Sequence, residues 1–359
     1  EQAFKDDAGA LVAMDPKTGE VIAMASLPSY DPNLFVNGIS FKDYGSLRDG
    51  YYRPLFNRAL TGQYPPGSTV KPFVGLAALE LGLQNASKKI KCPGYYQLPN
   101  DDHKYRCWKK EGHQHLNLDE SIAQSCDVYF YDMAHRMGID RMHDYLQQFG
   151  FGQRSGIDTL GEKPGLLPSS SWKKARKRQP WYPGETLISG IGQGYFLTTP
   201  MQLAVATSTL AMQGKKVQPH LLKAVEDQSG AVVGPSSLED VPVRNAGRWN
   251  YIKKSMRNVI HSSRGTAQRI GWGSPYKIAG KTGTAQVFTV KQDEEYEDLD
   301  VKKTLRDHAL FIAWTPAEDP QIAVAVIVEN GGHGGSVAAP IAKQVMDAYL
   351  LPKLALVEK

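Results

Sequence analysis

The sequence predicts a protein of the α/β class, in its α+β form, with one antiparallel sheet flanked by helices and an all-helical lobe inserted into the chain. Two observations lead to this prediction. Apolar, strand-like segments occur near both ends of the chain, at about 9–26 and 277–329, whereas the part between them has mainly helical periodicity. Strands at both ends with helices between them fit a single sheet that both termini build.

Length and composition fit one large α/β domain with a helical insert, or two modest domains. At 359 residues, with 41% hydrophobic and 22% charged residues, the chain can bury a sizeable core. Its net charge of +5 is too small to indicate nucleic acid, and the basic run at 173–178 is typical of a solvated face. We therefore expect no nucleic-acid partner, and the strands at both ends of the chain favour one domain over residues 1–359.

The N-terminus carries no signal peptide, and no apolar run approaches the roughly 18 residues that span a bilayer. Residue 1 falls just before a strand-like segment, as though a preceding part had been removed. We expect the chain to be the soluble portion of a longer protein.

The first elements are a hairpin and a buried helix. Two apolar segments, 9–15 and 20–26, flank a Pro-Lys-Thr-Gly turn and predict a β-hairpin. Residues 27–66 have neither helical nor strand period, which indicates an ordered connector. A helix is predicted at 68–83, and we expect it to be central because apolar residues cover most of its circumference.

Residues 84–117 look irregular, and further helices and strands follow them. Helices are predicted at about 118–124, 127–138, 140–148, 199–213, 248–260 and 338–350, and strands at 277–288, 309–314 and 321–329. The sheet should therefore come from about 9–26 and 277–350, and the helical lobe with its inserts from about 67–270.

The start of the 68–83 helix carries a candidate nucleophile. Ser68 and Lys71 are three residues apart, so on a helix the amine can reach the hydroxyl. Ser68 would also lie at the helix N-terminus, where backbone N–H groups favour developing negative charge. A capping serine beside a surface lysine is the plainer interpretation, because serine is a preferred cap and the same spacing recurs at three other serines.

A lysine base needs a neighbour that lowers its pKa, because its ordinary pKa of about 10.4 leaves it charged at neutral pH. A second cation close to Lys71 would lower the pKa of its amine, and Lys281 is our candidate for that cation. It opens the sequence Lys281-Thr282-Gly283-Thr284 in a strand-like run, whose small residues let a substrate backbone lie along the strand. The same tripeptide at 17–19 lies in the hairpin turn, so we favour the copy at 281.

The third element is Ser125-Cys126-Asp127, between two predicted helices. A hydroxyl at Ser125 could pass a proton from the lysine to a leaving amine, and Asp127 could hydrogen-bond lysine or substrate. Both residue types also cap helices, so no single element is specific. Their order and spacing fit the S-x-x-K, S-D-N and K-T-G set of penicillin-interacting serine enzymes, with Asp in place of the final Asn.

The sequence around these motifs resembles the transpeptidase domain of the class B penicillin-binding proteins, above all the branch that serves rod-shaped elongation in Gram-negative bacteria. The resemblance covers about 9–351 and is carried by YDPNLFVNGIS, PLFNRALTGQYPPGSTVKPF, GIGQGYFLTTPMQLA and GKTGTAQVF. It implies the penicillin-binding/β-lactamase-like transpeptidase fold. It also implies a D,D-transpeptidase that cross-links peptidoglycan stem peptides, is acylated by β-lactam antibiotics and needs no cofactor for catalysis.

By motif, the resemblance implies that Ser68 is the acylated nucleophile and Lys71 its general base. Ser125 and Asp127 form the middle motif, whose departure from Ser-x-Asn is usual in the elongation branch. The backbone N–H groups of Ser68 and Thr284 make the oxyanion hole, where one donor is worth about 3–4 kcal/mol. The strand motif that binds the terminal carboxylate of a D-Ala-D-Ala stem consists of Lys281, Thr282, Gly283 and Thr284.

The resemblance also implies a location and partners. Family members stand at the periplasmic face of the inner membrane, behind an N-terminal membrane anchor and a non-catalytic region that this sequence lacks, and they work with a SEDS-type glycosyltransferase. The alternatives are a D,D-carboxypeptidase or β-lactamase of the same fold, in which water takes the acyl group, and a β-lactam sensor. A hydrolase would clear bound penicillin quickly, whereas a transpeptidase would stay acylated.

The three cysteines, Cys92, Cys107 and Cys126, lie in one stretch of the chain with His113. Three Cys and one His form a recurrent tetrahedral zinc set, although these intervals exceed those of a finger-type site. The alternatives are a disulfide plus one free thiol, which an oxidising periplasm permits, and three unlinked thiols. We favour a structural zinc that holds the middle motif in place. Substitute ligands, should one of these be wrong, are Asp101, Asp102, His103 and His115.

Overall fold

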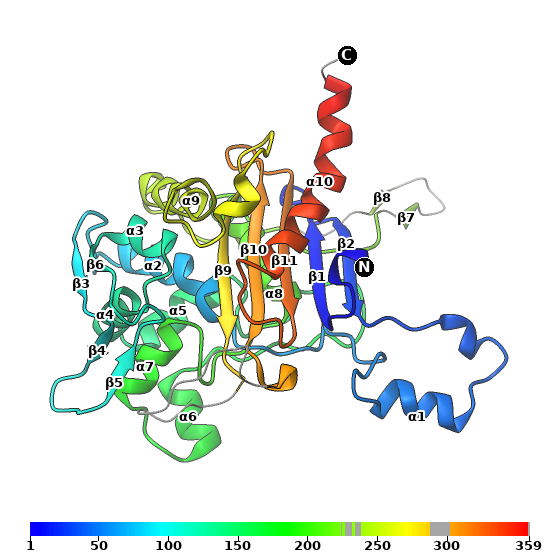
Figure 1. The fold of residues 1–359 in the computed structure, drawn as a ribbon, viewed down its shortest axis with the longest axis horizontal. Helices are drawn as coiled ribbons and strands as arrows, with labels where there is room; N and C mark the ends of the chain where they lie inside the picture. The colour runs from blue at the N-terminus through cyan, green and yellow to red at the C-terminus, as the bar shows by residue number, and fades with distance from the viewer. Residues whose placement is uncertain (224, 227–231, 234–237, 288–301, 358–359) are drawn as a thin grey trace.

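The structure is a computed structural model that describes residues 1–223, 225–226, 232–233, 238–287 and 302–357 (Figure 1). In this part of the chain, the central sheet has five antiparallel strands in the order β2-β1-β11-β10-β9. These strands are β1 (Gly9–Met14), β2 (Val21–Leu27), β9 (Ala279–Ala285), β10 (His308–Thr315) and β11 (Ile322–Val328). The predicted fold class, with strands from both ends of the chain in one sheet, is confirmed.

Helices cover the sheet on both faces (Figure 1). α8 (Pro200–Ala211) packs against β11 and β1, and α10 (Ala338–Val357) packs against β10 and β11. Every residue of β11 is buried as a result, which explains its unbroken apolar run. No helix among the described residues is long and apolar enough to cross a bilayer.

The lobe is built around α2 (Lys71–Glu80), whose ten residues are all buried. It packs against α4 (Asp127–Met137), α5 (Ile139–Gln147) and α9 (Ala246–His261). The predicted central helix is therefore present, but it begins later than expected. Residues 67–70 form a 3-10 turn, η3 (Gly67–Val70), ahead of it.

Some elements differ from the prediction. The 27–66 connector contains η2 (Pro32–Phe35) and α1 (Phe41–Asp49), which project away from the sheet (Figure 1). The lobe is not purely helical, since residues 84–117 form two ribbons, β3 (Ile90–Cys92) with β6 (Gln114–Leu116) and β4 (Tyr95–Gln97) with β5 (Lys104–Arg106). The remaining elements are α3 (Leu118–Ala123), α6 (Ser170–Lys177), α7 (Pro183–Gly190), β7 (Val225–Glu226), β8 (Val232–Val233), η1 (Gln2–Phe4), η4 (Gln268–Gly271) and η5 (Lys303–Leu305).

Candidate active site

Ser68 lies in the η3 turn directly before α2 and is partly exposed. Close backbone contacts place this turn. The Gly67 N–H donates to the Gly192 carbonyl at 2.8 Å. A Cβ at Gly67 would lie 2.4 Å from the Thr284 carbonyl oxygen, and a Cβ at Gly192 would lie 2.2 Å from the Gly67 oxygen. Glycine at both positions therefore lets the turn lie between the 192 segment and the edge strand β9.

Lys71, the first residue of α2, is fully buried beneath this turn. Its Nζ donates to Asp127 Oδ1 at 2.7 Å, to the Ser125 carbonyl at 2.8 Å and to Ser125 Oγ at 3.3 Å. Among the described residues, these bonds take the place of the expected hydrogen bond to the Ser68 hydroxyl. The first and middle motifs are thus joined through the Lys71 amine.

Lys281, on β9, is also fully buried and reaches the same serine. Its Nζ donates to Ser125 Oγ at 2.9 Å and to the Thr282 carbonyl at 2.9 Å. Burial, together with repulsion from Lys71, holds the pKa of Lys281 well below its ordinary value. The Ser125 hydroxyl consequently links two buried amines, and Ser125 itself adopts a left-handed backbone with φ of 57°.

Asp127 joins the middle motif to a residue that sequence reasoning missed. Its Oδ2 accepts the backbone N–H of Trp108 at 2.9 Å, and the Trp108 indole N–H donates to the Ser125 carbonyl at 3.0 Å. Burial raises the pKa of Asp127, although the Lys71 amine acts in the opposite direction. The only sequence signal for Trp108 is its place directly after Cys107.

The strand motif runs along β9 and faces the η3 turn. Thr282 Oγ1 lies 2.8 Å from the hydroxyl of Thr266, and the Thr284 carbonyl accepts a hydrogen bond from Gln193 Nε2 at 2.9 Å. A Cβ at Gly283 would lie 2.7 Å from the Thr69 methyl group. Sequence reasoning did not single out Thr266 or Gln193, because neither lies in one of the three motifs.

The four candidate metal ligands converge. The thiols of Cys92, Cys107 and Cys126 and one ring nitrogen of His113 all lie within 4.8 Å of one another, and all four residues are buried. The cysteines are free thiols, so the disulfide alternative is not found. Among the described residues, the substitute ligands at 101–103 and 115 lie outside the cluster.

The thiols of this cluster are close enough to change one another's acidity. Hydrogen bonds with Cys107 and Cys126 lower the pKa of Cys92, whereas hydrogen bonds with Cys107 and Cys92 raise the pKa of Cys126. The cluster also borders the middle motif on two sides, since Cys107 precedes Trp108 and Cys126 precedes Asp127. Whatever holds these four side chains together therefore also positions the Trp108–Asp127 hydrogen bond.

Known proteins match this chain along most of its length. The sequence profile of the penicillin binding protein transpeptidase domain matches residues 9–347. The chain is 45% identical over 355 residues to the protein named peptidoglycan D,D-transpeptidase MrdA from Haemophilus influenzae, covering 98% of this chain and 54% of that protein. It is 44% identical over 344 residues to MrdA of Escherichia coli K12, covering 95% and 54%. The chain thus spans about half the length of these relatives.

Solved structures agree with the sequence comparison. PBP2 of Pseudomonas aeruginosa, in complex with WCK 5153, has a TM-score of 0.89 and 52% identity, covering 98% of this chain and 72% of that one. PBP2 from Helicobacter pylori has a TM-score of 0.82 and 33% identity, covering 97% and 62%. The chain belongs to the penicillin-binding protein transpeptidase domain family.

Proposed function

We propose that the protein is a peptidoglycan D,D-transpeptidase that cross-links stem peptides through an acyl-enzyme on Ser68 during cell elongation. The observation that carries the proposal is the Ser125 hydroxyl, which contacts both Lys71 and Lys281 beneath the turn that presents Ser68. Relatives named peptidoglycan D,D-transpeptidase, 44% and 45% identical, support it.

In the acylation step, Ser68 Oγ attacks the penultimate carbonyl of a D-Ala-D-Ala stem. Its proton moves to Lys71, while the backbone N–H groups of Ser68 and Thr284 stabilise the oxyanion. The amide C–N bond then breaks, and the leaving D-alanine amine takes a proton through Ser125. The Lys281, Thr282 and Thr284 motif holds the terminal carboxylate, the group that a β-lactam also offers.

Lys71 can accept a proton only in its neutral form. Two buried amines that share the Ser125 hydroxyl repel each other, so they favour a single positive charge between them. We assign the Ser125 hydroxyl as the path along which a proton moves between the two amines. In the second step, an amine of a neighbouring stem attacks the ester carbonyl, and Ser68 regains its proton.

Product analysis with a synthetic stem peptide and an amine acceptor tests this function. We expect release of D-alanine together with a cross-linked product, and neither from Ser68→Ala. D-alanine release without cross-linked product at any acceptor concentration would identify a D,D-carboxypeptidase instead. Turnover of bound penicillin within minutes would identify a β-lactamase.

We also propose a structural zinc at the Cys92, Cys107, His113 and Cys126 cluster. Bonds of about 2.3 Å to sulfur and about 2.0 Å to nitrogen at a tetrahedral angle separate the two ligand atoms by about 3.5 Å. The distances from His113 Nδ1 to the Cys107 and Cys92 sulfurs are 3.5 and 3.6 Å, which agrees with this geometry. Four protein ligands leave no open position, so the ion would supply structure and take no part in the reaction.

Partners and location are proposed from the relatives. One solved structure is a complex between PBP2 and MreC from Helicobacter pylori, 34% identical to this chain, and another, 35% identical, concerns a peptidoglycan synthase complex that coordinates polymerization and crosslinking. We propose equivalent partners here, with a SEDS-type glycosyltransferase, at the periplasmic face of the inner membrane. Capture of the full-length tagged protein from solubilised membranes, without either partner, would contradict this.

A further inference from the structure

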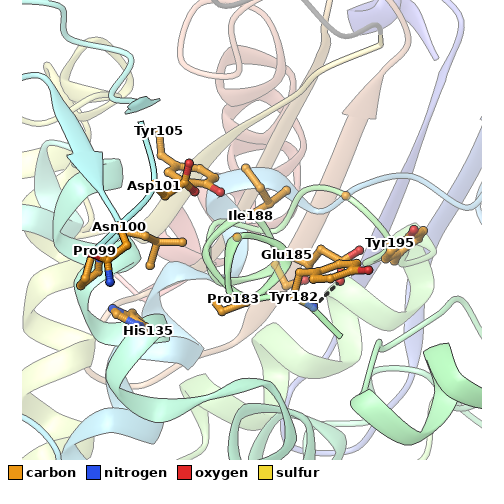
Figure 2. Close-up of a pocket in the computed structure, with 14 residues that line it drawn as sticks. Pro99, Asn100, Asp101, Tyr105, His135, Tyr182, Pro183, Glu185, Ile188 and Tyr195 are labelled. Atoms are coloured by element: carbon orange, nitrogen blue, oxygen red, sulfur yellow. Dashed lines mark hydrogen bonds between the residues drawn. The ribbon is translucent and has the colours of Figure 1, made fainter. Parts of the chain in front are cut away.

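A cavity of about 870 Å³ lies between the β4–β5 ribbon, α4 and α7, and Ser68 is not part of its lining. Asp101 and Tyr105 contribute from the ribbon, His135 from α4, Tyr182 and Ile188 from α7 and its start, and Tyr195 from the segment that follows (Figure 2). Its volume lies in the range of sites that hold small molecules or side chains. The catalytic mechanism gives this cavity no role.

Three segments that line the cavity also contain residues of the catalytic centre or residues that contact it. The ribbon leads from Tyr105 to Trp108, which donates to the Ser125 carbonyl and to Asp127. Helix α4 begins at Asp127 itself. The segment before Tyr195 contains Gln193, which donates to the Thr284 carbonyl. Gly194, which lines the cavity, directly follows Gln193, so this end of the cavity lies near Thr284 at the end of β9.

The lining of the cavity is mostly apolar and carries carboxylates without a lysine or arginine. Glu185 is already satisfied, because its Oε1 accepts from Lys173 at 2.5 Å and its Oε2 from the Tyr182 backbone at 2.8 Å. Asp101 differs. Its Oδ1 accepts the His103 backbone N–H at 2.9 Å and its carboxylate hydrogen-bonds the Tyr105 phenol, both uncharged donors, and no cation among the described residues forms an ion pair with it.

Asp101 also lies close to the Tyr105 phenol. Burial and the Asp101 carboxylate together raise the pKa of Tyr105, and the two side chains lie together on one side of the cavity (Figure 2). A carboxylate among tyrosine rings and aliphatic walls suits one class of ligand, an ammonium on an alkyl chain. The charge pairs with the carboxylate, and the chain packs on the apolar wall.

We propose that this cavity binds the amine-bearing side chain of the donor stem peptide. The inference rests on the proposed function. Cross-linking joins a carbonyl of one stem to an amine of another, and both stems are copies of one polymer, so the donor also carries such an amine. A donor that lies along β9 places the residues upstream of its scissile bond at the Thr284 end. Asp101 there pairs with the ammonium and selects stems whose amine is still free.

The test compares two synthetic donors that end in D-Ala-D-Ala and differ only in a lysine side chain upstream, which is free in one and acetylated in the other. We expect the wild-type protein to release D-alanine from the free-amine donor with a kcat/KM about 10-fold higher, chiefly through KM. Asp101→Asn should abolish this preference and leave the acetylated donor unaffected. Asp102→Asn, an exposed neighbour outside the lining, should keep the preference.

Penicillin lacks this side chain, so acylation of Ser68 by penicillin should be equal in all three proteins. A second readout needs no turnover: the free-amine donor should slow penicillin acylation at a lower concentration than the acetylated donor does. Equal kcat/KM for both donors in the wild type, or an equal loss for both in Asp101→Asn, overturns the inference while the transpeptidase function stands. Failure of penicillin to acylate the wild type overturns both.

Discussion

At the scale of single residues, the site depends on how two buried lysines are partnered. Lys71 has a carboxylate partner in Asp127 at 2.7 Å, whereas Lys281 has hydroxyl and carbonyl partners only among the bonds described. Removing an ammonium from water without a counter-charge disfavours its protonated form. The lowered pKa therefore belongs to Lys281, and the Ser125 hydroxyl between them couples the two amines.

The lowered pKa of Lys281 predicts how stability changes with pH. In the unfolded chain this lysine titrates near its ordinary pKa of about 10.4, and in the folded protein it titrates well below that. Between the two pKa values the unfolded chain binds more protons, so the free energy of unfolding rises with pH. Below that window the burial of the charge is fully unfavourable.

Lys281→Met removes this titration. We expect the variant to exceed the wild type in free energy of unfolding near pH 7, and we expect the excess to shrink as the pH rises toward about 10. Urea denaturation at a series of pH values measures both quantities. A difference that stays constant or grows with pH would show that Lys281 is not the amine with the lowered pKa.

At the scale of elements, three backbone segments meet beside Ser68: η3, the turn at Gly192 after α7, and β9. Gly192→Ala places a methyl group 2.2 Å from the Gly67 carbonyl oxygen, so the turn must move. We expect the rate of penicillin acylation to fall by roughly 100-fold or more, because displacements of about 1 Å at a reacting centre have effects of that size.

Gly82→Ala is the matched control for this change. Gly82 also has a positive φ, 69° against 75° for Gly192, but nothing lies within 4 Å of its ideal Cβ. This variant carries the left-handed strain, about 1 kcal/mol, without the backbone collision. If both variants acylate at the same rate, close approach at Gly192 does not position Ser68.

The metal cluster is the second contact between elements that positions the site. It joins β3, the end of β5 and the start of α4 through Cys92, Cys107 and Cys126. We expect His113→Ala to lose bound zinc, to lower the melting temperature and to slow acylation, because the Trp108–Asp127 hydrogen bond loses its support. His115→Ala, which changes an exposed histidine two residues away, should keep the metal. Native mass spectrometry and thermal denaturation report both effects; a metal-free wild type that melts at the same temperature contradicts the zinc proposal.

At the scale of the whole molecule, the sheet and the central helix could be predicted because each leaves a strong pattern in the sequence. β11 is an unbroken apolar run and β10 is apolar over residues 309–314, and α2 between its end residues is apolar because the whole helix is buried. Helix α1 has no buried residue and α7 begins with Pro-Gly, so neither has the periodicity that predicts a helix.

The residues of the three motifs and the metal cluster could also be predicted, because their chemistry requires particular side chains. The contacts that position them could not. The Trp108 backbone N–H donates to the Asp127 carboxylate, and the Gly67 backbone N–H donates to the Gly192 carbonyl. Backbone donors of this kind leave no side-chain pattern in the sequence. Lys173 is a similar case: the basic run predicts a solvated face, yet this one lysine is buried, paired with Glu185 and 4.5 Å from the Tyr182 ring.

The most direct test is the intact mass of the protein after incubation with a labelled penicillin, followed by peptide mapping. The account predicts one long-lived adduct per chain, carried by the peptide that contains Ser68, and no adduct on Ser68→Ala. An adduct that persists in Ser68→Ala, or that maps to another residue, would contradict Ser68 as the nucleophile.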